Sequence, residues 1–420
     1  MIYTSVKSIL LDVGRTIKAQ ILKLKYKKTL LRLRYNYGNR KIVVAFCVSE
    51  IAKWKCQSLY DCLEKSERFL PLVYVYPSPL DFNNDSASIG SLLNEKINFF
   101  EAKKMQVINV WDTETNKCII PKSRYADIIF YQQPWDTPPF PLPINTADFA
   151  LSFYIPYYLV NNFDINLEFG QRLHYQIYGY IVQNETLAEL YTSMLTKRYY
   201  AGKCFGLGHT IVDYLNTKHT DTKNNSVIYA PHFSFPVPGK DRVLTYSTFL
   251  ENGKLILAFA KQHPEIEWIF KPHPRLRLEL EQTGVWTKEE IECYYDEWGK
   301  IGVVCTSSDY AKYFQNSFAM ITDCGSFLTE YSCMDKPLIR LYYHKENLEP
   351  NPILEKLYST FYYAHNNVEL IELLETIINK RRDPKLEIRH EAVTSLGLNR
   401  IDSAEKIVAF IDSLLNSRYH

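Results

Sequence analysis

Several motifs are absent from this 420-residue sequence, and each absence excludes a class of protein. None of the nine cysteines forms a CxxC pair and their number is odd, so we expect no metal cluster, no disulfide framework and a reducing compartment. The sequence contains neither GxxxxGK[ST] nor GxGxxG, which argues against a P-loop NTPase or an ordinary dinucleotide enzyme. The nearest approach to a metal-binding DxD is Asp112-Thr-Glu114, a poor match. We therefore expect neither a metal site nor a cofactor.

Long apolar runs and a large net charge are also missing. No apolar stretch approaches the roughly 18–20 residues that a membrane-spanning helix needs. The N-terminus builds no compact apolar core with a cleavage site, so no signal peptide is expected. The net charge of +2 argues against a nucleic-acid partner. With 46% hydrophobic and 23% charged residues, the composition is that of a globular protein, which we expect in the cytoplasm.

The N-terminal segment concentrates positive charge. Residues 1–40 carry ten basic side chains and one acidic side chain, a local +9, so the other 380 residues sum to 2 − 9 = −7. The apolar residues of this segment recur at helical spacing: Ile9, Leu10, Val13, Ile17, Ile21 and Leu22. A basic amphipathic helix of this type binds anionic membrane surfaces, which predicts a peripheral protein at the inner face of the cell membrane. The alternative is a solvated helix packed on the first domain.

From residue 41 onward, short β-branched or aromatic runs alternate with helical patterns, which predicts parallel, doubly wound sheets. The alternation restarts after Thr217–Ser226, a polar stretch and the best linker candidate. We predict an α/β fold of GT-B type, with one Rossmann-like domain at 41–222, a second at 223–420 that ends in closing helices, and a ligand cleft between them. The expected strands are 41–47, 69–75, 106–110, 127–131 and 149–154, then 227–230, 267–270, 303–305, 319–322 and 337–341.

Three segments of the second half begin where a strand is expected to end, at Tyr229–Ser234, Trp268–Pro274 and Ile321–Glu330. Because the carboxyl ends of parallel strands share one edge of a sheet, we expect these segments to converge on one crevice.

The third segment predicts a phosphate site. Its strand ends at Asp323, Gly325 permits a tight turn and Ser326 opens a helix. A helix N-terminus offers unpaired N–H groups and partial positive charge to a phosphate. Glu330 lies one turn further along the same face, where its carboxylate can accept hydrogen bonds from a ribose. The alternative is ordinary N-capping by Ser326 and a solvated Glu330.

The second segment places Lys271 and His273 in a frame made rigid by Pro272 and Pro274. A lysine and a histidine held in this way suit a diphosphate, as a neutralising charge and a proton donor. His232, in the first segment, is a further catalytic candidate, with a polar loop residue as the alternative.

Candidates are fewer in the first half. Ser49 and Glu50 follow its first strand, and Gln133 and Asp136 follow the strand at 127–131. We expect Ser49, Glu50 and Gln133 to contact an acceptor. The base for an acceptor hydroxyl would come from Asp136 or from His232.

As an ordered set, the motifs of residues 226–345 resemble the CDP-glycerol glycerophosphotransferase family, the teichoic-acid and capsule polymerases of bacteria. The set comprises Tyr229-Ala-Pro231, Lys271-Pro-His-Pro274, Ile321-Thr-Asp-Cys-Gly-Ser326, Glu330-Tyr331 and Lys336-Pro337. The resemblance implies a GT-B fold, a cytidine-diphosphate polyol donor in the second domain, and a glycan or lipid-linked acceptor at the membrane.

Residue by residue, the resemblance places His273 on the family's essential KPHP-type histidine. It places Asp323, Gly325 and Ser326 on the family's donor loop, with Gly325 in place of a serine, and Glu330 where the family often has Asp. The family's Trp-His-Gly-Thr-Pro stretch has only Trp135-Asp-Thr-Pro138 as its counterpart, without the histidine that is a candidate base.

The reaction that we predict is the transfer of glycerol or ribitol phosphate from a CDP-activated donor to an acceptor hydroxyl, with CMP leaving. One rival is a glycosyltransferase that uses a CMP-sugar or another nucleotide sugar, and a more distant one is a nucleotide-sugar epimerase. A rival of another class is a catalytically silent nucleotide-binding scaffold of a capsule-assembly complex.

Overall fold

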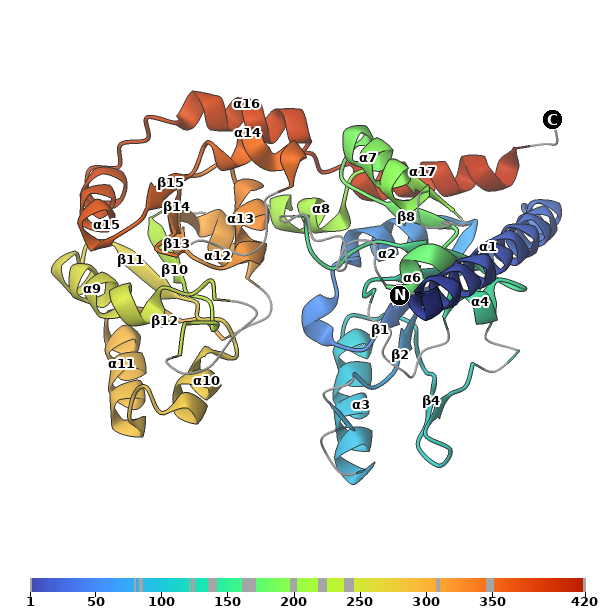
Figure 1. The fold of residues 1–420 in the computed structure, drawn as a ribbon, viewed down its shortest axis with the longest axis horizontal. Coiled ribbons are helices and arrows are strands. Elements are labelled where there is room, and N and C mark those ends of the chain that lie inside the picture. Colours follow the sequence, from blue (N-terminus) through green and yellow to red (C-terminus); the bar gives the residue numbers. More distant parts are fainter. Residues whose placement is uncertain are drawn as a thin grey trace. The chain divides into compact units, whose positions relative to one another are not determined.

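The chain forms two compact units, each built on a parallel sheet (Figure 1). The structure is a computed structural model, and it describes residues 2–78, 81–82, 86–120, 122, 125–134, 142–160, 171–196, 202–217, 225–237, 245–306, 310–344 and 351–417. The first unit comprises Met1–Tyr157, Asp164–Asp213 and Asp402–His420, and the second comprises Tyr158–Phe163 and Tyr214–Ile401.

The first unit contains a sheet of seven parallel strands in the order β3-β2-β1-β6-β7-β8-β9. These strands are β1 (Ile42–Val48), β2 (Phe69–Val75), β3 (Val107–Asn109), β6 (Ile128–Tyr131), β7 (Leu151–Tyr154), β8 (Gly179–Ile181) and β9 (Lys203–Phe205), and β4 (Trp111–Asp112) forms a hairpin with β5 (Lys117–Cys118). The helices are α1 (Ile2–Asn36), α2 (Gln57–Glu64), α3 (Ser86–Glu101), α4 (Pro143–Thr146), α6 (Arg172–Gln176), α7 (Glu185–Thr196) and α17 (Ser403–Asn416), with a 3-10 turn at Ile51–Lys53. Helix α8 (Thr210–Asn216) begins in this unit, and its residues from Tyr214 onward belong to the second.

The second unit contains six parallel strands in the order β12-β11-β10-β13-β14-β15. They are β10 (Ser226–Ala230), β11 (Glu267–Phe270), β12 (Gly302–Val304), β13 (Ser317–Thr322), β14 (Leu338–Leu341) and β15 (Tyr362–Ala364). The helices are α9 (Phe249–Gln262), α10 (Leu276–Thr283), α11 (Lys288–Ile301), α12 (Ala311–Asn316), α13 (Gly325–Ser332), α14 (Glu355–Tyr358), α15 (Asn367–Leu373) and α16 (Leu386–Leu396), with a 3-10 turn at Pro352–Leu354 and a π-helix at Leu374–Asn379.

The strand order decides where each unit can bind a ligand. In the second unit the chain builds outward from β10 to β11 and β12, then returns to the other side of β10 with β13. The loops after β10 and β13 therefore leave the sheet in opposite directions, and a doubly wound fold binds its ligand at such a switch point. The first unit repeats this order, with β1 and β6 at its switch point.

An aromatic core supports the switch point of the second unit. Phe270, at the end of β11, stacks on Trp298 of α11 with ring centroids 5.1 Å apart, and Tyr229 of β10 stacks on Phe270 at 5.8 Å. All three side chains are buried. Burial of aromatic side chains of this size holds the strand ends, and thus the loops that follow them, in fixed positions.

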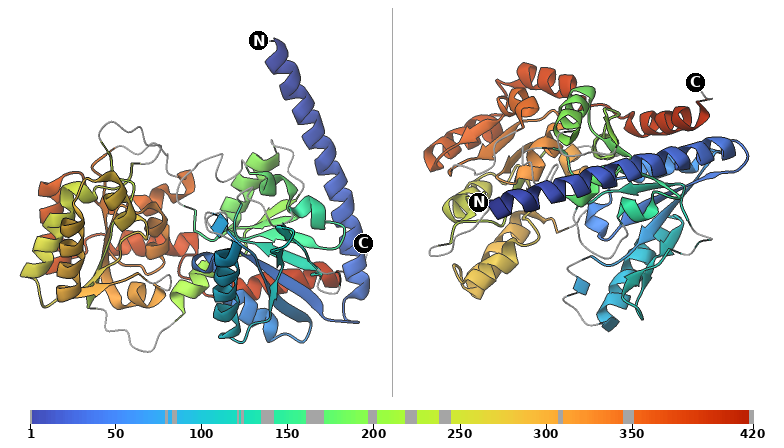
Figure 2. Two further views of the ribbon diagram at one scale, coloured as in Figure 1. Left: turned by 90° about the horizontal axis from the view of Figure 1, so that it is seen from below. Right: turned by 45° about the vertical axis from the view of Figure 1, so that its right-hand side comes forward.

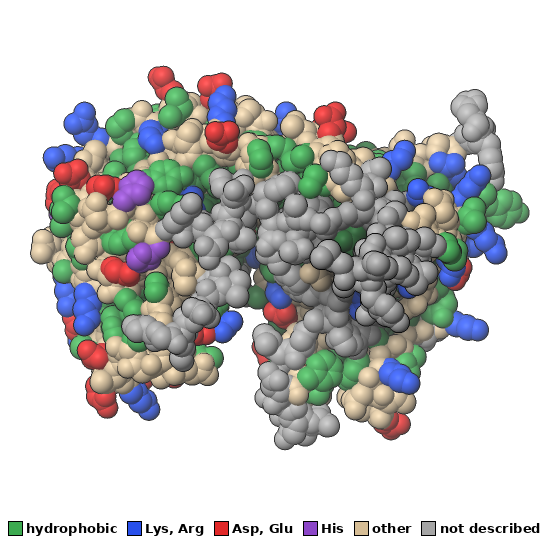
Figure 3. Space-filling model, in the orientation of Figure 1, with side chains coloured by type: hydrophobic (Ala, Val, Ile, Leu, Met, Phe, Trp, Pro, Cys, Tyr) green, Lys and Arg blue, Asp and Glu red, His purple; other side chains and the backbone are tan. Residues whose placement is uncertain are grey.

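On the face of this unit seen in Figure 3, described side chains of both charges are interspersed.

The hairpin of β4 and β5 was not predicted. All ten predicted strands lie on strands of the structure, and β8, β9 and β15 are the strands of the two parallel sheets that were not predicted. Each of these three strands has only three residues, which is too short to show an alternating or a continuous apolar pattern.

The last helix was predicted as part of the second domain, but it packs in the first unit. Asp213 accepts hydrogen bonds from the backbone N–H groups of Ser403 (3.1 Å) and Ala404 (2.8 Å) at the start of α17. The Arg34 side chain of α1 donates to the carbonyl of Leu414 near its end (3.0 Å). Sequence order does not reveal such a return of the chain, because the contacts join residues about 190 or more positions apart.

The predicted N-terminal helix is present as α1, and its second half packs on the first unit. Leu22, Tyr26 and Leu33 are buried, and the Thr29 hydroxyl donates to the carbonyl of Ala147 (2.6 Å). The first half projects beyond the rest of the unit (Figure 2). Ile17 is exposed on this helix, as are Ile21 and Leu24. No helix in the described part of the chain is both long enough and apolar enough to span a bilayer.

Candidate functional site

The three predicted loops of the second unit converge at the carboxyl ends of β10, β11 and β13. β10 is hydrogen-bonded to both other strands, so the three loops are neighbours. The backbone N–H of His273 donates to the carbonyl of Pro231 (3.0 Å), which joins the second loop to the first. The Thr322 hydroxyl donates to the carbonyl of Ala230 (2.6 Å), which joins the third loop to the first.

Asp323 holds two of these loops and the start of α9 together. One carboxylate oxygen accepts the backbone N–H of His232 (2.6 Å), and the other accepts both the N–H (2.7 Å) and the hydroxyl (3.1 Å) of Thr248. Burial raises the pKa of Asp323 to about 6, although these hydrogen bonds favour the ionised form. Asp323 was predicted to bind the donor, but its carboxylate is engaged inside the protein, so it positions the neighbouring loops. Thr248 has no sequence motif and was not predicted.

His232 and His273 form a pair, with ring centroids 5.0 Å apart. Nδ1 of His273 accepts the N–H of Arg275 (3.1 Å), and Nδ1 of His232 accepts the N–H of Ser234 (3.2 Å). Nδ1 of His232 also lies 2.8 Å from the Ser234 hydroxyl. The bond from Arg275 assigns the proton of the neutral His273 ring to Nε2, and the bond from the Ser234 N–H favours the same tautomer of His232, which makes both histidines N–H donors. Burial lowers the pKa of His232 to about 3 and that of His273 to about 4, with further lowering by Arg275. Both rings are therefore neutral at pH 7.

Lys271 is buried beside two aromatic rings that sequence reasoning missed. Its Nζ lies 5.1 Å from the ring centroid of Tyr310 and 5.7 Å from that of Phe327. The Tyr310 hydroxyl donates a hydrogen bond to the carboxylate of Glu330. Burial lowers the pKa of Lys271, and the nearby carboxylate of Glu330 partly offsets this lowering. Glu330 is buried rather than solvated, so the alternative prediction for this residue was wrong.

The third loop leads into α13, which begins at Gly325 rather than at Ser326. Cys324 is the N-cap residue and makes no capping hydrogen bond through its side chain. Ser326 therefore does not cap the helix, and its hydroxyl lies 3.4 Å from Cys324 Sγ. Gly325 is not among the described glycines with positive φ. The tight turn that we predicted at Gly325 therefore does not need the conformational freedom of a glycine. The uncapped N–H groups at the start of α13 remain suited to an anion.

In the first unit, the structure brings together the three residues predicted to contact an acceptor. The Ser49 hydroxyl donates to the side-chain oxygen of Gln133 (2.9 Å), and the Gln133 amide donates to the Glu50 carboxylate (3.3 Å). Glu50 also accepts a hydrogen bond from Lys53 (2.6 Å). This cluster lies where β1 and β6 end, at the switch point of its own sheet. Asp136, the candidate base, lies outside the described residues.

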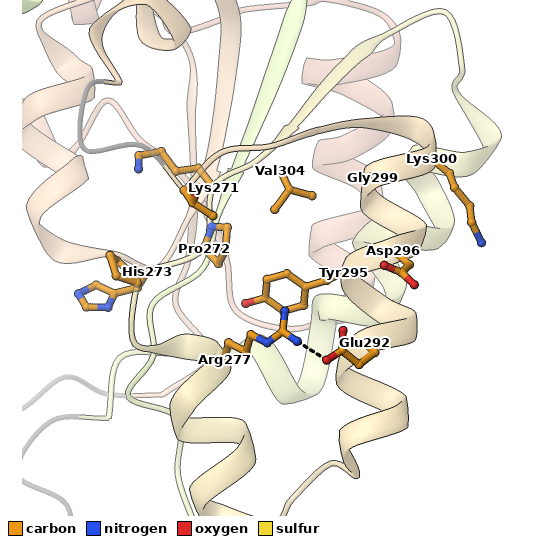
Figure 4. Close-up of a pocket in the computed structure, with 12 residues that line it drawn as sticks. Lys271, Pro272, His273, Arg277, Glu292, Tyr295, Asp296, Gly299, Lys300 and Val304 are labelled. Atoms are coloured by element: carbon orange, nitrogen blue, oxygen red, sulfur yellow. Dashed lines mark hydrogen bonds and ion pairs between the residues drawn. The ribbon is translucent and has the colours of Figure 1, made fainter.

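A cavity of about 750 Å³ lies behind the second loop of the second unit. Figure 4 shows it between this loop, α11 and the end of β12, with the side chains of Lys271 and His273 extending away from Tyr295. His273 thus lines the cavity, but its ring extends away from Tyr295. Among the described residues, no group of three or more His, Cys, Asp or Glu side chains is placed to hold a metal ion.

Comparison with known proteins supports the fold assignment. No model of a protein family matches this chain, and no curated protein matches its sequence. The solved structure of the wall teichoic acid polymerase TagF is similar, with a TM-score of 0.57, 12% identity and 97% of each chain covered. The UDP-GlcNAc 2-epimerase of Neisseria meningitidis, bound to UDP-GlcNAc, has a TM-score of 0.56 at 13% identity, covering 89% of this chain and 100% of that one.

The chain has a GT-B-type fold. The predicted α/β class with two Rossmann-like domains is thereby confirmed, and both sheets agree with it. A putative UDP-N-acetylglucosamine 2-epimerase of Listeria monocytogenes is a further similar structure, with a TM-score of 0.51 and 14% identity over 89% of this chain and 96% of that one. At identities this low, the likeness establishes the fold alone.

Proposed function

We propose that this protein transfers a polyol phosphate, glycerol phosphate or ribitol phosphate, from a CDP-activated donor to a glycan or lipid-linked acceptor in cell-wall or capsule synthesis. The observation that carries the proposal is the convergence of the His232–His273 pair, Lys271 and the N-terminus of α13 at one switch point. Neutral N–H donors, a buried ammonium and free helix N–H groups together suit a diphosphate. The likeness of the fold to a wall teichoic acid polymerase supports this proposal.

In the proposed reaction, an acceptor oxygen attacks the phosphorus that carries the polyol. The bond from this phosphorus to the bridging oxygen breaks, and CMP leaves with that oxygen. His273 and His232 donate Nε2–H groups to the phosphate oxygens, and Lys271 compensates the charge that develops on CMP. Such groups accelerate a reaction mostly by positioning the reactants and stabilising developing charge.

The remaining donor contacts follow from the third loop. Gly325 and Ser326, at the start of α13, direct backbone N–H groups at the diphosphate. Glu330, oriented by the Tyr310 hydroxyl, accepts a hydrogen bond from a ribose hydroxyl. Asp323 acts indirectly, by fixing the His232 loop.

On the acceptor side, we propose that Ser49, Glu50 and Gln133 bind the hydroxyl-bearing end of the acceptor, and that Asp136 receives its proton. His232 is less suited to act as this base, because its hydrogen-bonded Nδ1 leaves the proton on Nε2. The basic helix α1 holds the protein at the anionic inner face of the cell membrane, where a lipid-linked acceptor is accessible.

A panel of donors tests the reaction. Purified full-length protein is incubated with CDP-glycerol, CDP-ribitol, CMP-sialic acid or UDP-GlcNAc, and the release of CMP or UDP is measured. We expect CMP release from a CDP-polyol that depends on His273. Preference for CMP-sialic acid would favour a glycosyltransferase. Conversion of UDP-GlcNAc without UDP release would favour an epimerase, the second candidate, which the likeness to a UDP-GlcNAc-bound epimerase supports. Nucleotide binding without turnover would favour a scaffold.

A further inference from the structure

The cavity behind the second loop has a lining that suits a ligand of different chemistry from a diphosphate. It is formed by the loop after β11, one face of α11 and the end of β12 (Figure 4). Its lining residues are Lys271, Pro272, His273, Pro274, Arg277, Glu292, Tyr295, Asp296, Gly299, Lys300, Val304 and Thr306.

Two of the three cations of this lining are already paired, and the third, Lys271, extends its side chain away from Tyr295 (Figure 4). Arg277 forms ion pairs with Glu292 and Glu281, and its guanidinium lies 5.4 Å from the ring centroid of Tyr295. Lys300 pairs with Glu297 at 2.7 Å. An anionic ligand would therefore gain little attraction here and would meet the Asp296 carboxylate. A cationic ligand would meet the side chains of Arg277 and Lys300, which also line the cavity.

Three polar groups of the lining have no protein partner. The Tyr295 hydroxyl, the Asp296 carboxylate and the Thr306 hydroxyl make no hydrogen bond to another residue in the described part of the chain. Tyr295 is half-buried, whereas Asp296 and Thr306 are exposed to solvent. Burial raises the pKa of Tyr295, so its hydroxyl stays protonated and can both donate and accept. Two hydroxyls and a carboxylate around a tyrosine ring match a ligand that carries many hydroxyl groups.

Gly299 lines the cavity without contributing a side chain. It lies within α11, where a glycine is less stable than an alanine by about 1 kcal/mol. A Cβ built on Gly299 meets no atom within 4 Å, and its φ does not lie in the left-handed region. Neither backbone conformation nor helix packing therefore requires a glycine at this position, so a larger side chain here can occupy the cavity without disturbing the helix.

We propose that this cavity binds a neutral polyhydroxylated unit, a sugar or polyol residue of the acceptor chain. The inference rests on the proposed function for the identity of the ligand, and on the lining alone for its chemical class. Pro272 and His273 belong to both the cavity lining and the loop of the proposed donor site, so a bound unit would lie beside the donor diphosphate. Occupation of the cavity would hold the second loop, and with it His273, in place.

Binding of neutral saccharide probes to the full-length protein tests this site. The probes are N,N′-diacetylchitobiose and glycerol. Their binding is measured by saturation-transfer NMR and by calorimetry, with and without saturating CDP-glycerol. Gly299→Leu fills the cavity, and Asp296→Asn removes its unpaired charge. Gly90→Leu is the matched control, because Gly90 also lies in a helix with no atom within 4 Å of a Cβ.

We expect at least one probe to bind the wild type and the Gly90→Leu variant equally, and Gly299→Leu to weaken that binding at least about tenfold. Affinity for CDP-glycerol should be unchanged in all variants, and Asp296→Asn should weaken probe binding severalfold. Equal probe binding by Gly299→Leu, displacement of the probe by CDP-glycerol, or no binding by either probe would each overturn the proposal. Probe binding in a protein that turns over no CDP-polyol would reject the proposed function and leave the saccharide site standing.

Discussion

The switch points of the two sheets share a strand order but differ in how their polar groups are held. In the second unit, Asp323, Lys271 and Glu330 are buried, and Asp323 bonds to backbone groups of other segments. In the first unit, Glu50 and Gln133 are half-buried and bond to each other. A buried, fully bonded network resists rearrangement, whereas partly exposed side chains adapt at little cost. We infer a preorganised donor site in the second unit and an adaptable acceptor site in the first.

The largest expected effect comes from removing a donor ligand of the second unit. His273→Ala should lower the turnover of a CDP-polyol about 100-fold or more, because an N–H directed at developing charge is lost. The matched control is His263→Ala, which alters the chain's other His-Pro pair, at the end of α9. Steady-state CMP release and circular dichroism measure the outcome. A natively folded His273→Ala protein with unchanged turnover would remove this residue from the site.

A charge placed at the start of α13 separates a binding role from a structural one. Ser326→Asp should preserve the melting temperature, because an acidic residue is favourable in the first turn of a helix. It should weaken nucleotide binding at least about tenfold, because the carboxylate repels the diphosphate. Calorimetric titration of CDP-glycerol or CMP into both proteins measures this, and equal affinities would contradict the assignment of this loop to the donor.

The histidine pair predicts how donor affinity depends on pH. The pKa of His273 is about 4 in the free protein, and a bound diphosphate stabilises the imidazolium and raises this pKa. Since the bound state then takes up protons, affinity should increase as the pH falls from 7 toward 5, by up to about tenfold per pH unit. Calorimetry across this range should show a shallower slope for His273→Gln. An affinity that is flat or falls on acidification would argue against contact with the diphosphate.

Membrane binding is expected to depend on the first unit alone. Lys18 is exposed on α1, and Lys18→Gln should weaken binding to anionic vesicles about fivefold, since one cation near the surface contributes about 1 kcal/mol. Lys288→Gln, an exposed lysine at the start of α11, is the control. Co-sedimentation at two salt concentrations measures the effect, which screening should diminish. A deletion of residues 1–38 would be a poor test, because Leu22, Tyr26 and Leu33 pack on the unit. Equal vesicle binding by the two variants would contradict a role for α1.

The smallest effect is expected at the acceptor cluster. Gln133→Ala removes the link between Ser49 and Glu50, and it should raise the KM for the acceptor about threefold, because hydrogen bonds of this kind contribute about 0.5–1 kcal/mol. The affinity for the donor should stay unchanged. Initial rates at varied acceptor concentration measure this effect. A weakened donor affinity instead would mean that the two units do not divide the substrates as proposed.

The sequence by itself determined the parts of this protein that depend on local pattern. Continuous apolar runs identified ten strands, and their alternation with helices identified the fold class, since both are properties of neighbouring residues. The residues after strands 227–230, 267–270 and 319–322 identified the converging loops, because the carboxyl ends of parallel strands necessarily share an edge.

Only the tertiary structure decided which of these residues face a ligand and which serve the fold. Asp323 carries a donor-loop motif, yet its carboxylate bonds to Thr248, 75 positions away, and to His232, 91 positions away. Tyr310 and Phe327 lie beside Lys271 without any motif. Gly299 lines a cavity that no local pattern marks. These roles arise from contacts between distant segments, and burial, which shifts the pKa values of the site, exists only once those segments have packed.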